Sequence, residues 1–323
     1  MELEVRHLRA LCAIADTGSV RKAALQLGMT QPSLTTQLRR IETSLGGMLF
    51  TRGQTGSRPT PLGHSVLSRA RPIIAEMTAL VSAARDAAGG VGGLRLRIGS
   101  IGSRAVTGWL RRIHQRLPDT DTTIHIDVSS NTLLQLLATN QLDVAFVQET
   151  PGLPLAVPPG VERRVLIACE PRFVCLSDRH RAAGRPAVRL RELAHDAWIV
   201  DPTADDEVTA LRRVFTAAGL DPRLVHVRDA TTAAELVASG EAVRPAQPTA
   251  APAPGTVIRP LHGDPLTAQL SLASRPGSLP LPQLDALFAD LMASYVDLAA
   301  ADTTYRAWLD RSGSPLLPSV GSH

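Results

Sequence analysis

Residues 18–47, GSVRKAALQLGMTQPSLTTQLRRIETSLGG, decide how the N-terminal part of this chain folds. Apolar residues recur in this stretch at helical spacing in two runs, and Gly28 separates the two runs. Thr30 is suited to cap the second helix, and Pro32 fits the first turn of that helix, where no backbone N–H is needed. The pattern therefore predicts a short helix, a tight turn and a longer helix, which is typical of a helix-turn-helix at about Val20–Arg39.

The outer face of the second helix is polar, as expected of a helix that reads DNA. Gln and Thr can hydrogen-bond base edges or contact thymine methyls, and Arg pairs with phosphate or guanine. Residues 48–61 then predict a basic hairpin, which is typical of a wing that reaches the backbone or minor groove. The alternative is an ordinary solvated helix face. The predicted DNA-binding residues are Thr30 as a cap near phosphate, Gln31, Ser33, Thr35 and Thr36 for bases, and Arg39, Arg40, Arg52 and Arg58 for the backbone.

Positive charge is concentrated in the same part of the chain. Residues 1–93 hold 11 Lys and Arg against 6 Asp and Glu, a net charge of +5, and the remaining residues hold 23 against 24, a net charge of −1. A basic head on a nearly neutral body indicates that a polyanion binds the head. Double-stranded DNA is the expected partner.

The stretch from Leu11 to Gly63 closely resembles the N-terminal domain of LysR-type transcriptional regulators. That resemblance implies a winged helix-turn-helix over residues 1–61, a homodimer through the next helix, a tetramer as the larger assembly, and regulation by a small-molecule effector. Many relatives have Ser-Arg where this chain has Thr35-Thr36, so base reading by an arginine fork is not carried over. The residues that carry the resemblance are Ala15, Gly18-Ser19, Ala23-Ala24, Leu27, Gln31-Pro32-Ser33-Leu34, Gln37-Leu38, Ile41-Glu42, Leu45-Gly46, Leu49-Phe50-Thr51-Arg52 and Thr60-Pro61-Leu62-Gly63.

Residues 62–88 predict one long linker helix with an apolar seam. About 27 helical residues span roughly 40 Å, and such a seam is expected to pair with a second copy of the chain. Packing on its own protein is the alternative. Pro72 is expected to bend the helix or weaken it, and the glycine-rich residues 89–93 are expected to form a hinge. The seam consists of Leu62, Val66, Ala70, Ile73, Met77, Leu80, Ala84 and Ala87.

The remaining residues predict an α/β effector domain over 94–300. Strands and helices alternate as β-α-β-α-β from residue 94, which indicates a parallel sheet covered by helices. The order resembles the family's two-lobed effector-binding domain, which is similar to periplasmic binding proteins. The fold class is thus a winged helix-turn-helix, a linker helix and a two-lobed α/β domain. The expected boundaries are 94–161 with 268–300 for the first lobe, 162–267 for the second, and 301–323 for a loose tail.

Polar residues at the ends of predicted strands mark a candidate effector site. Ligands of open α/β sheets bind at the carboxyl ends of strands, and helix N-termini and hydroxyl groups favour anions. A small carboxylate or similar polar effector is therefore expected between the lobes, although Asp201 opposes an anion. Each residue is equally well suited to be an ordinary helix cap. The candidates are Ser100, Ser103, Ser129, Ser130, Gln148, Asp201 and Thr203.

Several other classes of protein are disfavoured. The sequence has no GxSxG, HExxH or GxxxxGK[ST] motif, so an enzyme is not expected. Its histidines and its cysteines Cys12, Cys169 and Cys175 lack metal-ligand spacing, so no metal or other cofactor is expected. Without a signal peptide or a long apolar run, a cytoplasmic protein is expected rather than an exported solute-binding protein. A regulator whose sensor has lost its ligand stays open, because Arg244-Pro245 interrupts an expected buried strand.

Overall fold

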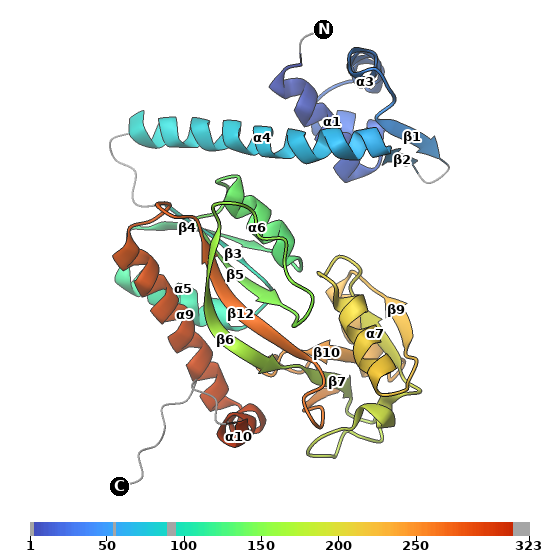
Figure 1. Cartoon of the computed structure of the whole chain (residues 1–323), viewed down its shortest axis with the longest axis vertical. Helices are drawn as coiled ribbons and strands as arrows, with labels where there is room; N and C mark the ends of the chain where they lie inside the picture. The colour runs from blue at the N-terminus through green and yellow to red at the C-terminus, as the bar shows by residue number, and fades with distance from the viewer. Residues whose placement is uncertain (1–2, 54–55, 89–94, 313–323) are drawn as a thin grey trace. The chain divides into compact units, whose positions relative to one another are not determined.

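The computed structural model describes residues 3–53, 56–88 and 95–312, and the chain divides near residue 92 into two compact units (Figure 1). The elements of the N-terminal unit are α1 (Val5–Thr17), α2 (Val20–Gln26), α3 (Gln31–Leu45), β1 (Phe50–Gly53), β2 (Gly56–Pro59) and α4 (Pro61–Ala88). The predicted helix-turn-helix is therefore formed by α2 and α3.

The first three helices share one apolar core. Leu11, Ile14, Leu34 and Ile41 are at most 1% exposed. Ala23 of α2 is completely buried in the same core, and its small side chain permits a close approach of the helices. The core thus fixes which face of α3 points outward.

The hairpin β1–β2 is antiparallel, with Thr51 opposite Arg58, as the sequence predicts for a wing. The chain passes very close to itself where α4 begins: a Cβ added at Gly63 would lie 2.1 Å from the carbonyl oxygen of Leu49. Only glycine fits there, and the hairpin base is thereby held against the start of α4.

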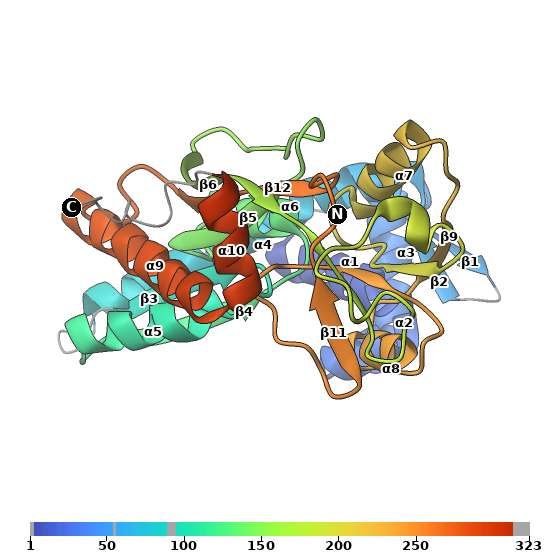
Figure 2. The ribbon, with the colours of Figure 1, turned by 90° about the horizontal axis from the view of Figure 1, so that it is seen from below.

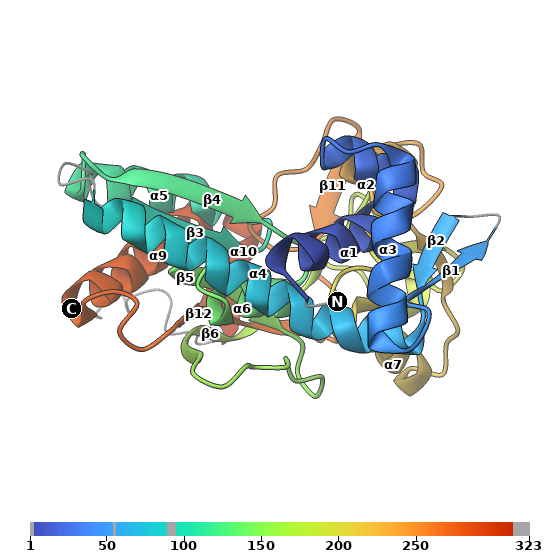
Figure 3. The same cartoon turned by 90° about the horizontal axis from the view of Figure 1, so that it is seen from above.

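Helix α4 continues without interruption past Pro72. Its first half packs on α1 (Figure 3), where Leu67 and Ala70 are buried in the N-terminal core. The prediction of one continuous unpartnered seam is therefore wrong at Ala70. Further along, Ile73, Met77 and Leu80 are 40–62% exposed, and the side chains of Ala84 and Ala87 lie outside the described residues.

The C-terminal unit has two lobes, and the first is built on a five-stranded sheet in the order β4-β3-β5-β12-β6. Strands β3, β4 and β5 are parallel, and β12 is antiparallel to both of its neighbours. Helices α5 and α9 lie side by side (Figure 2), and Nε1 of Trp109 donates to the carbonyl of Leu287 at 2.9 Å. The elements are β3 (Arg95–Ser100), α5 (Ala105–Arg116), β4 (Asp121–Ile126), α6 (Ser130–Ala138), β5 (Val144–Glu149), β6 (Glu162–Pro171), β12 (Thr267–Ser274) and α9 (Leu281–Ala301).

The second lobe contains a three-stranded sheet, β10-β7-β11, and a parallel pair, β8-β9. A bridge between Trp198 and Val243 joins the two sheets. Pro245 lies in β10, at an edge of the three-stranded sheet, and an edge strand tolerates proline. The elements are β7 (Phe173–Ser177), η1 (Leu190–Leu193), β8 (Ala197–Val200), α7 (Glu207–Ala217), β9 (Arg223–His226), α8 (Ala230–Ala238), β10 (Arg244–Ala246) and β11 (Thr256–Arg259).

The predicted lobe boundary at residue 162 differs from the structure. Residues 162–171 form β6, which pairs with β12 throughout its length and so belongs to the five-stranded sheet of the first lobe. The chain crosses to the second lobe only at Arg172, between β6 and β7. The strand pairing that assigns these residues to the first lobe cannot be read from the sequence.

The predicted loose tail is wrong for residues 303–312, which form α10 (Thr303–Ser312). Tyr305 and Leu309 lie one helical turn apart and are at most 1% exposed in the core of the first lobe. The hydroxyl groups of Tyr295 and Tyr305 both donate to Oε1 of Glu170, which is fully buried. A buried carboxyl group needs such donors, and α10 supplies one of them.

Candidate functional site

The first candidate site is the outward face of α3 and the adjoining wing. Leu34, Leu38 and Ile41 face the core, so Gln31 and Ser33 are exposed on the opposite side. The side chain of Thr30 accepts a hydrogen bond from the Ser33 N–H at 3.3 Å and caps the helix, as predicted. The arrangement leaves the Gln31 amide and the Ser33 hydroxyl exposed at the helix N-terminus.

Two predicted base-reading residues are less available than the others. Thr35 is half-buried. The hydroxyl of Thr36 donates to the carbonyl of Pro32 at 2.9 Å, so its hydrogen is used within α3. The exposed methyl group of Thr36 is the part of this side chain that remains free for an apolar contact.

Arg39, Arg40 and Arg58 form the basic part of this surface. All three are exposed, and within the described residues none of them is in an ion pair with Asp or Glu. The side chain of Arg52 lies outside the described side chains, so its predicted role is not tested. Unneutralised guanidinium groups on one surface are suited to bind phosphate.

A residue with no predicted role, Glu42, joins α3 to the wing. Its Oε1 accepts hydrogen bonds from the N–H groups of Leu49 at 2.8 Å and Phe50 at 3.4 Å. The wing therefore starts from a fixed point on the helix that would carry base contacts. The Ile41-Glu42 pair belongs to the motif, but its partners could not be read from the sequence.

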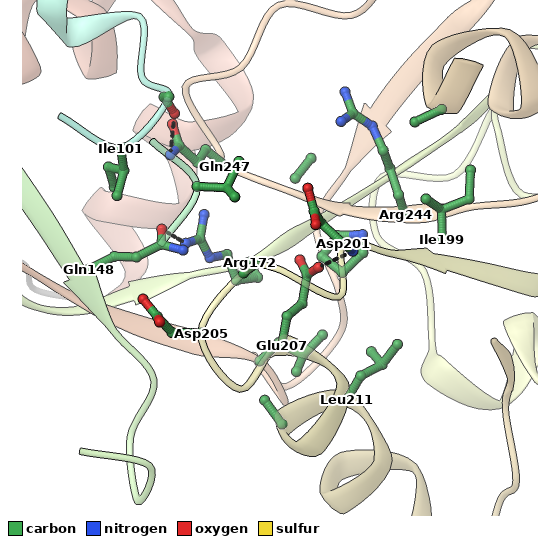
Figure 4. A pocket seen from close by; sticks show the side chains of 18 of the residues that line it. Ile101, Gln148, Arg172, Ile199, Asp201, Asp205, Glu207, Leu211, Arg244 and Gln247 are labelled. Carbon is green, nitrogen blue, oxygen red and sulfur yellow. Dashed lines mark hydrogen bonds between the residues drawn. The ribbon is translucent and has the colours of Figure 1, made fainter. Parts of the chain in front are cut away.

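The second candidate site is a cavity of about 390 Å³ that is lined by residues of both lobes (Figure 4). Gln148 lies at the end of β5 and Asp201 follows β8, so both occupy the carboxyl ends of strands. Arg172 enters from the crossover between β6 and β7, and Glu207 begins α7. The site is thus assembled where the chain passes between the lobes.

Of the seven predicted effector residues, Gln148 and Asp201 line this cavity, and the others do not. The hydroxyl of Ser100 is buried and donates to the carbonyl of Ile101 at 2.7 Å. The hydroxyl of Thr203 donates to Oδ1 of Asp201 at 2.5 Å. The others are engaged in local contacts: Ser103 accepts from the Ala105 N–H, Ser129 donates to Asp205, and Ser130 accepts from the Gln148 N–H.

Asp205 links the two lobes directly. Its Oδ1 accepts from the Ser129 hydroxyl and from Nδ2 of Asn131, both at 2.9 Å, and its Oδ2 accepts from the Asn131 N–H at 3.0 Å. These donors lie at the N-terminus of α6 in the first lobe, where a negative charge is favoured. The anion position that the sequence predicts at Ser129 and Ser130 is thus occupied by a carboxylate of the protein itself.

Opposite charges are close together in the cavity. Burial raises the pKa of the Glu207 carboxyl, and the Asp201 N–H and the positive charge of Arg172 oppose that increase. Oε2 of Glu207 accepts the Asp201 N–H at 2.8 Å. Arg172 donates to the side-chain oxygen of Gln148. Arg172, Asp205 and Glu207 have no strand-end signature, so the sequence did not single them out, and Arg244 was noted only because Arg244-Pro245 interrupts an expected strand.

The described residues include neither a metal-binding cluster nor a membrane-spanning helix. No group of three or more His, Cys, Asp or Glu side chains in that part of the chain could hold a metal ion. Cys12, Cys169 and Cys175 are free thiols. No helix among the described residues combines the length and the apolar character that crossing a bilayer requires.

Two family models match the chain. Residues 5–64 match the bacterial regulatory helix-turn-helix protein of the lysR family, and residues 88–295 match the LysR substrate binding domain. The first match lies in the N-terminal unit, and the second spans most of the C-terminal unit.

Curated relatives are similar over nearly the whole length. The small neutral protease regulatory protein of Streptomyces coelicolor is 52% identical over 318 residues, which are 98% of this chain and 94% of the relative. Its counterpart in Streptomyces lividans is also 52% identical, over 98% of this chain and 90% of the relative. The transcriptional regulator ShiR of Corynebacterium glutamicum is 31% identical, over 75% of this chain and 81% of the relative.

Solved structures have the same fold. The crystal structure of CbnR, a LysR family transcriptional regulator, matches with a TM-score of 0.60 at 23% identity, over 90% of this chain and 99% of CbnR. Full-length CbnR in complex with target DNA matches with a TM-score of 0.55 at 25% identity, over 90% of this chain and 100% of that one.

Proposed function

Because this chain belongs to the LysR family of transcriptional regulators, we propose that α3 and the wing read its operator and that the inter-lobe cavity binds its effector. The family assignment makes the chain a DNA-binding transcriptional regulator with an effector-binding domain. We propose below which residues contact DNA and how the effector acts.

In this proposal α3 lies in the major groove. Gln31 and Ser33 contact base edges, and the methyl group of Thr36 contacts thymine. Arg39, Arg40 and Arg58 contact phosphates on either side. The observation that carries this assignment is the exposed polar face of α3, to which Glu42 fixes the wing.

Two copies are proposed to pair through α4. The exposed side chains of Ile73, Met77 and Leu80 recur at intervals of four and three residues, which places them on one stripe of the helix. Pairing covers this apolar stripe and sets the distance between two DNA-reading heads, so the operator is expected to be pseudo-palindromic.

The effector is proposed to act by changing the stability of the contacts between the two lobes. Asp205 joins them at α6, and Gln247 of the second lobe donates to the Gly102 carbonyl of the first at 2.9 Å. A ligand that binds one arrangement of the lobes better than another shifts their equilibrium. The shift then changes the spacing of the heads on DNA.

A neutral protease gene is proposed as a target, because the two Streptomyces relatives at 52% identity are named as regulators of a small neutral protease. The test is a footprint of the purified protein on DNA upstream of a neutral protease gene and of its own gene, at low and high salt. Protection of a pseudo-palindromic site that weakens steeply with salt is expected. Protection of the DNA upstream of its own gene alone would contradict the protease assignment, and protection of neither at low salt would contradict the assigned recognition surface.

A further inference from the structure

The inter-lobe cavity carries charges of both signs in nearly equal number. Its lining includes three arginines and four carboxylates. An anionic effector would meet the carboxylates, and a cationic one would meet the arginines, so either alone leaves an uncompensated charge in a partly desolvated space. The charged lining residues are Arg172, Arg228, Arg244, Asp201, Asp205, Glu207 and Asp229.

The carboxylates differ in how much of their capacity the protein already uses. Asp205 is committed to α6, and Asp229 caps α8 through Thr232 at 2.7 Å. Glu207 accepts only the Asp201 N–H, through Oε2, and within the described residues its Oε1 has no hydrogen-bond partner. Glu207 and its neighbour Asp201 therefore have oxygen atoms left for a ligand donor (Figure 4).

The arginines differ in the same way. The guanidinium of Arg172 is directed to Gln148 (Figure 4). Nε of Arg244 is buried, and no group in the described part of the chain accepts a hydrogen bond from it. A buried donor without an acceptor is unfavourable, and within the described residues Arg244 forms no ion pair with Asp or Glu, so its charge is left for a ligand carboxylate. Arg244 is therefore the arginine that we expect to bind an anionic group of the ligand.

Most of the uncharged lining is apolar, beside the polar side chains of Gln148, Thr150, Gln247 and Thr267. A cavity of about 390 Å³ is at the small end of the range for ligand sites, which is about 300–1,000 Å³. It therefore suits a small molecule with an apolar body. The apolar side chains are Ile101, Val128, Ile199, Leu211, Val227 and Leu266.

The geometry points to a zwitterionic effector: a free α-amino acid with an apolar side chain, whose ammonium group binds Glu207 and Asp201 and whose carboxylate binds Arg244. Arg172 stands between Gln148 and Glu207 and can supply a second donor to the same carboxylate. This inference rests on the proposed role of the cavity as the effector site. It differs from the simple carboxylate that the sequence suggests, because Asp205 already occupies the anion position at α6.

The test is isothermal titration calorimetry of the full-length protein with the common protein amino acids, each at up to about 5 mM, followed by matched analogues of the best binder. For leucine these are 4-methylpentanoate, which lacks the amino group, and 3-methylbutylamine, which lacks the carboxylate. The amino acid is expected to bind at least about tenfold more tightly than either analogue. Equal binding of the carboxylate analogue, or no binding by any amino acid, would overturn the inference.

Two variants locate the ligand. Glu207→Gln is expected to weaken the amino acid at least about tenfold and to leave the carboxylate analogue unchanged, and Arg244→Met is expected to weaken both. Asp119→Asn changes an exposed carboxylate outside the cavity and is the control. A gel shift on the footprinted operator is run in parallel. If DNA binding persists and no amino acid binds, the ligand class fails while the regulator assignment stands.

Discussion

Arg39 has its guanidinium on the exposed face of α3, and no carboxylate in the described residues neutralises it. Arg39→Ala is therefore expected to lower affinity about equally for specific and unrelated DNA, and to reduce the slope of log K against log salt by about one unit. Binding is measured by fluorescence anisotropy across a salt series, with the exposed Arg111→Ala of the C-terminal unit as the control. An unchanged slope would remove Arg39 from the phosphate contacts.

Glu170 makes the stability of the first lobe depend on pH. Burial raises the pKa of its carboxyl, opposed by the charge of Arg172 and by the hydroxyls of Tyr295 and Tyr305. The folded state then holds the proton more firmly than the unfolded state. The stabilising contribution is thus complete below the unfolded pKa of about 4.3 and is lost as the pH rises through the raised folded value.

Glu170→Gln cannot ionise, so its free energy of unfolding should decline less than that of the natural protein as the pH rises above the unfolded pKa of about 4.3. Urea unfolding at several pH values measures the difference between the two proteins. Parallel curves for the two would show that Glu170 does not titrate in this range. The amide keeps the size of the side chain and an acceptor for the tyrosines, so packing is nearly matched.

At the residue scale the sequence predicts only part of the candidate effector site. Asp201 follows β8 and Gln148 lies near the end of β5, and both line the cavity, whereas Ser100 at the end of β3 does not. Ser129 was predicted to face a ligand, but it donates to Asp205, 76 residues further along the chain. No local pattern contains that contact, because it exists only when the second lobe lies against the first.

At the scale of elements, the N-terminus of α6 is held by a carboxylate of the other lobe. Asp205→Ala removes three hydrogen bonds, and it is expected to destabilise the contact between the lobes by about 1–3 kcal/mol. Hydrogen exchange at the Asn131 amide should accelerate accordingly. Asp119→Ala, at an exposed site, is the matched control. Unchanged exchange at Asn131 would mean that the inter-lobe contact is not stabilising.

Elements with a strong apolar period can be predicted from the sequence, whereas the short strand β11 and the polar helix α10 are not predicted. Helices α1–α3, α7 and α9 follow apolar stripes and glycine breaks that are plain in the sequence. Strand β11 was missed because its four residues follow a proline-rich stretch. Helix α10 was missed because its polar residues resemble a tail, although Tyr305 and Leu309 are spaced to face one core.

At the scale of the whole molecule, the exposed stripe of α4 predicts a dimer. Met77→Glu places a charge on the stripe and should raise the dimer dissociation constant at least about tenfold. Light scattering after size-exclusion chromatography, over a range of protein concentrations, measures the effect. His64→Glu is the control, since His64 is exposed on the same helix nine residues before Ile73, half a turn away. An unchanged dimer would place the interface elsewhere.

The two cores differ in how much chain each of them requires. The N-terminal core is formed by residues between Leu8 and Ile74. The core of the first lobe of the effector domain is formed by residues from Leu96 to Leu309. Translation at about 5–20 residues per second leaves roughly 10–50 s between completion of the head and completion of the sensor. During that interval each nascent chain has a complete N-terminal core but an incomplete effector domain. Neighbouring nascent chains on one message can then pair before either of them is able to respond to a ligand.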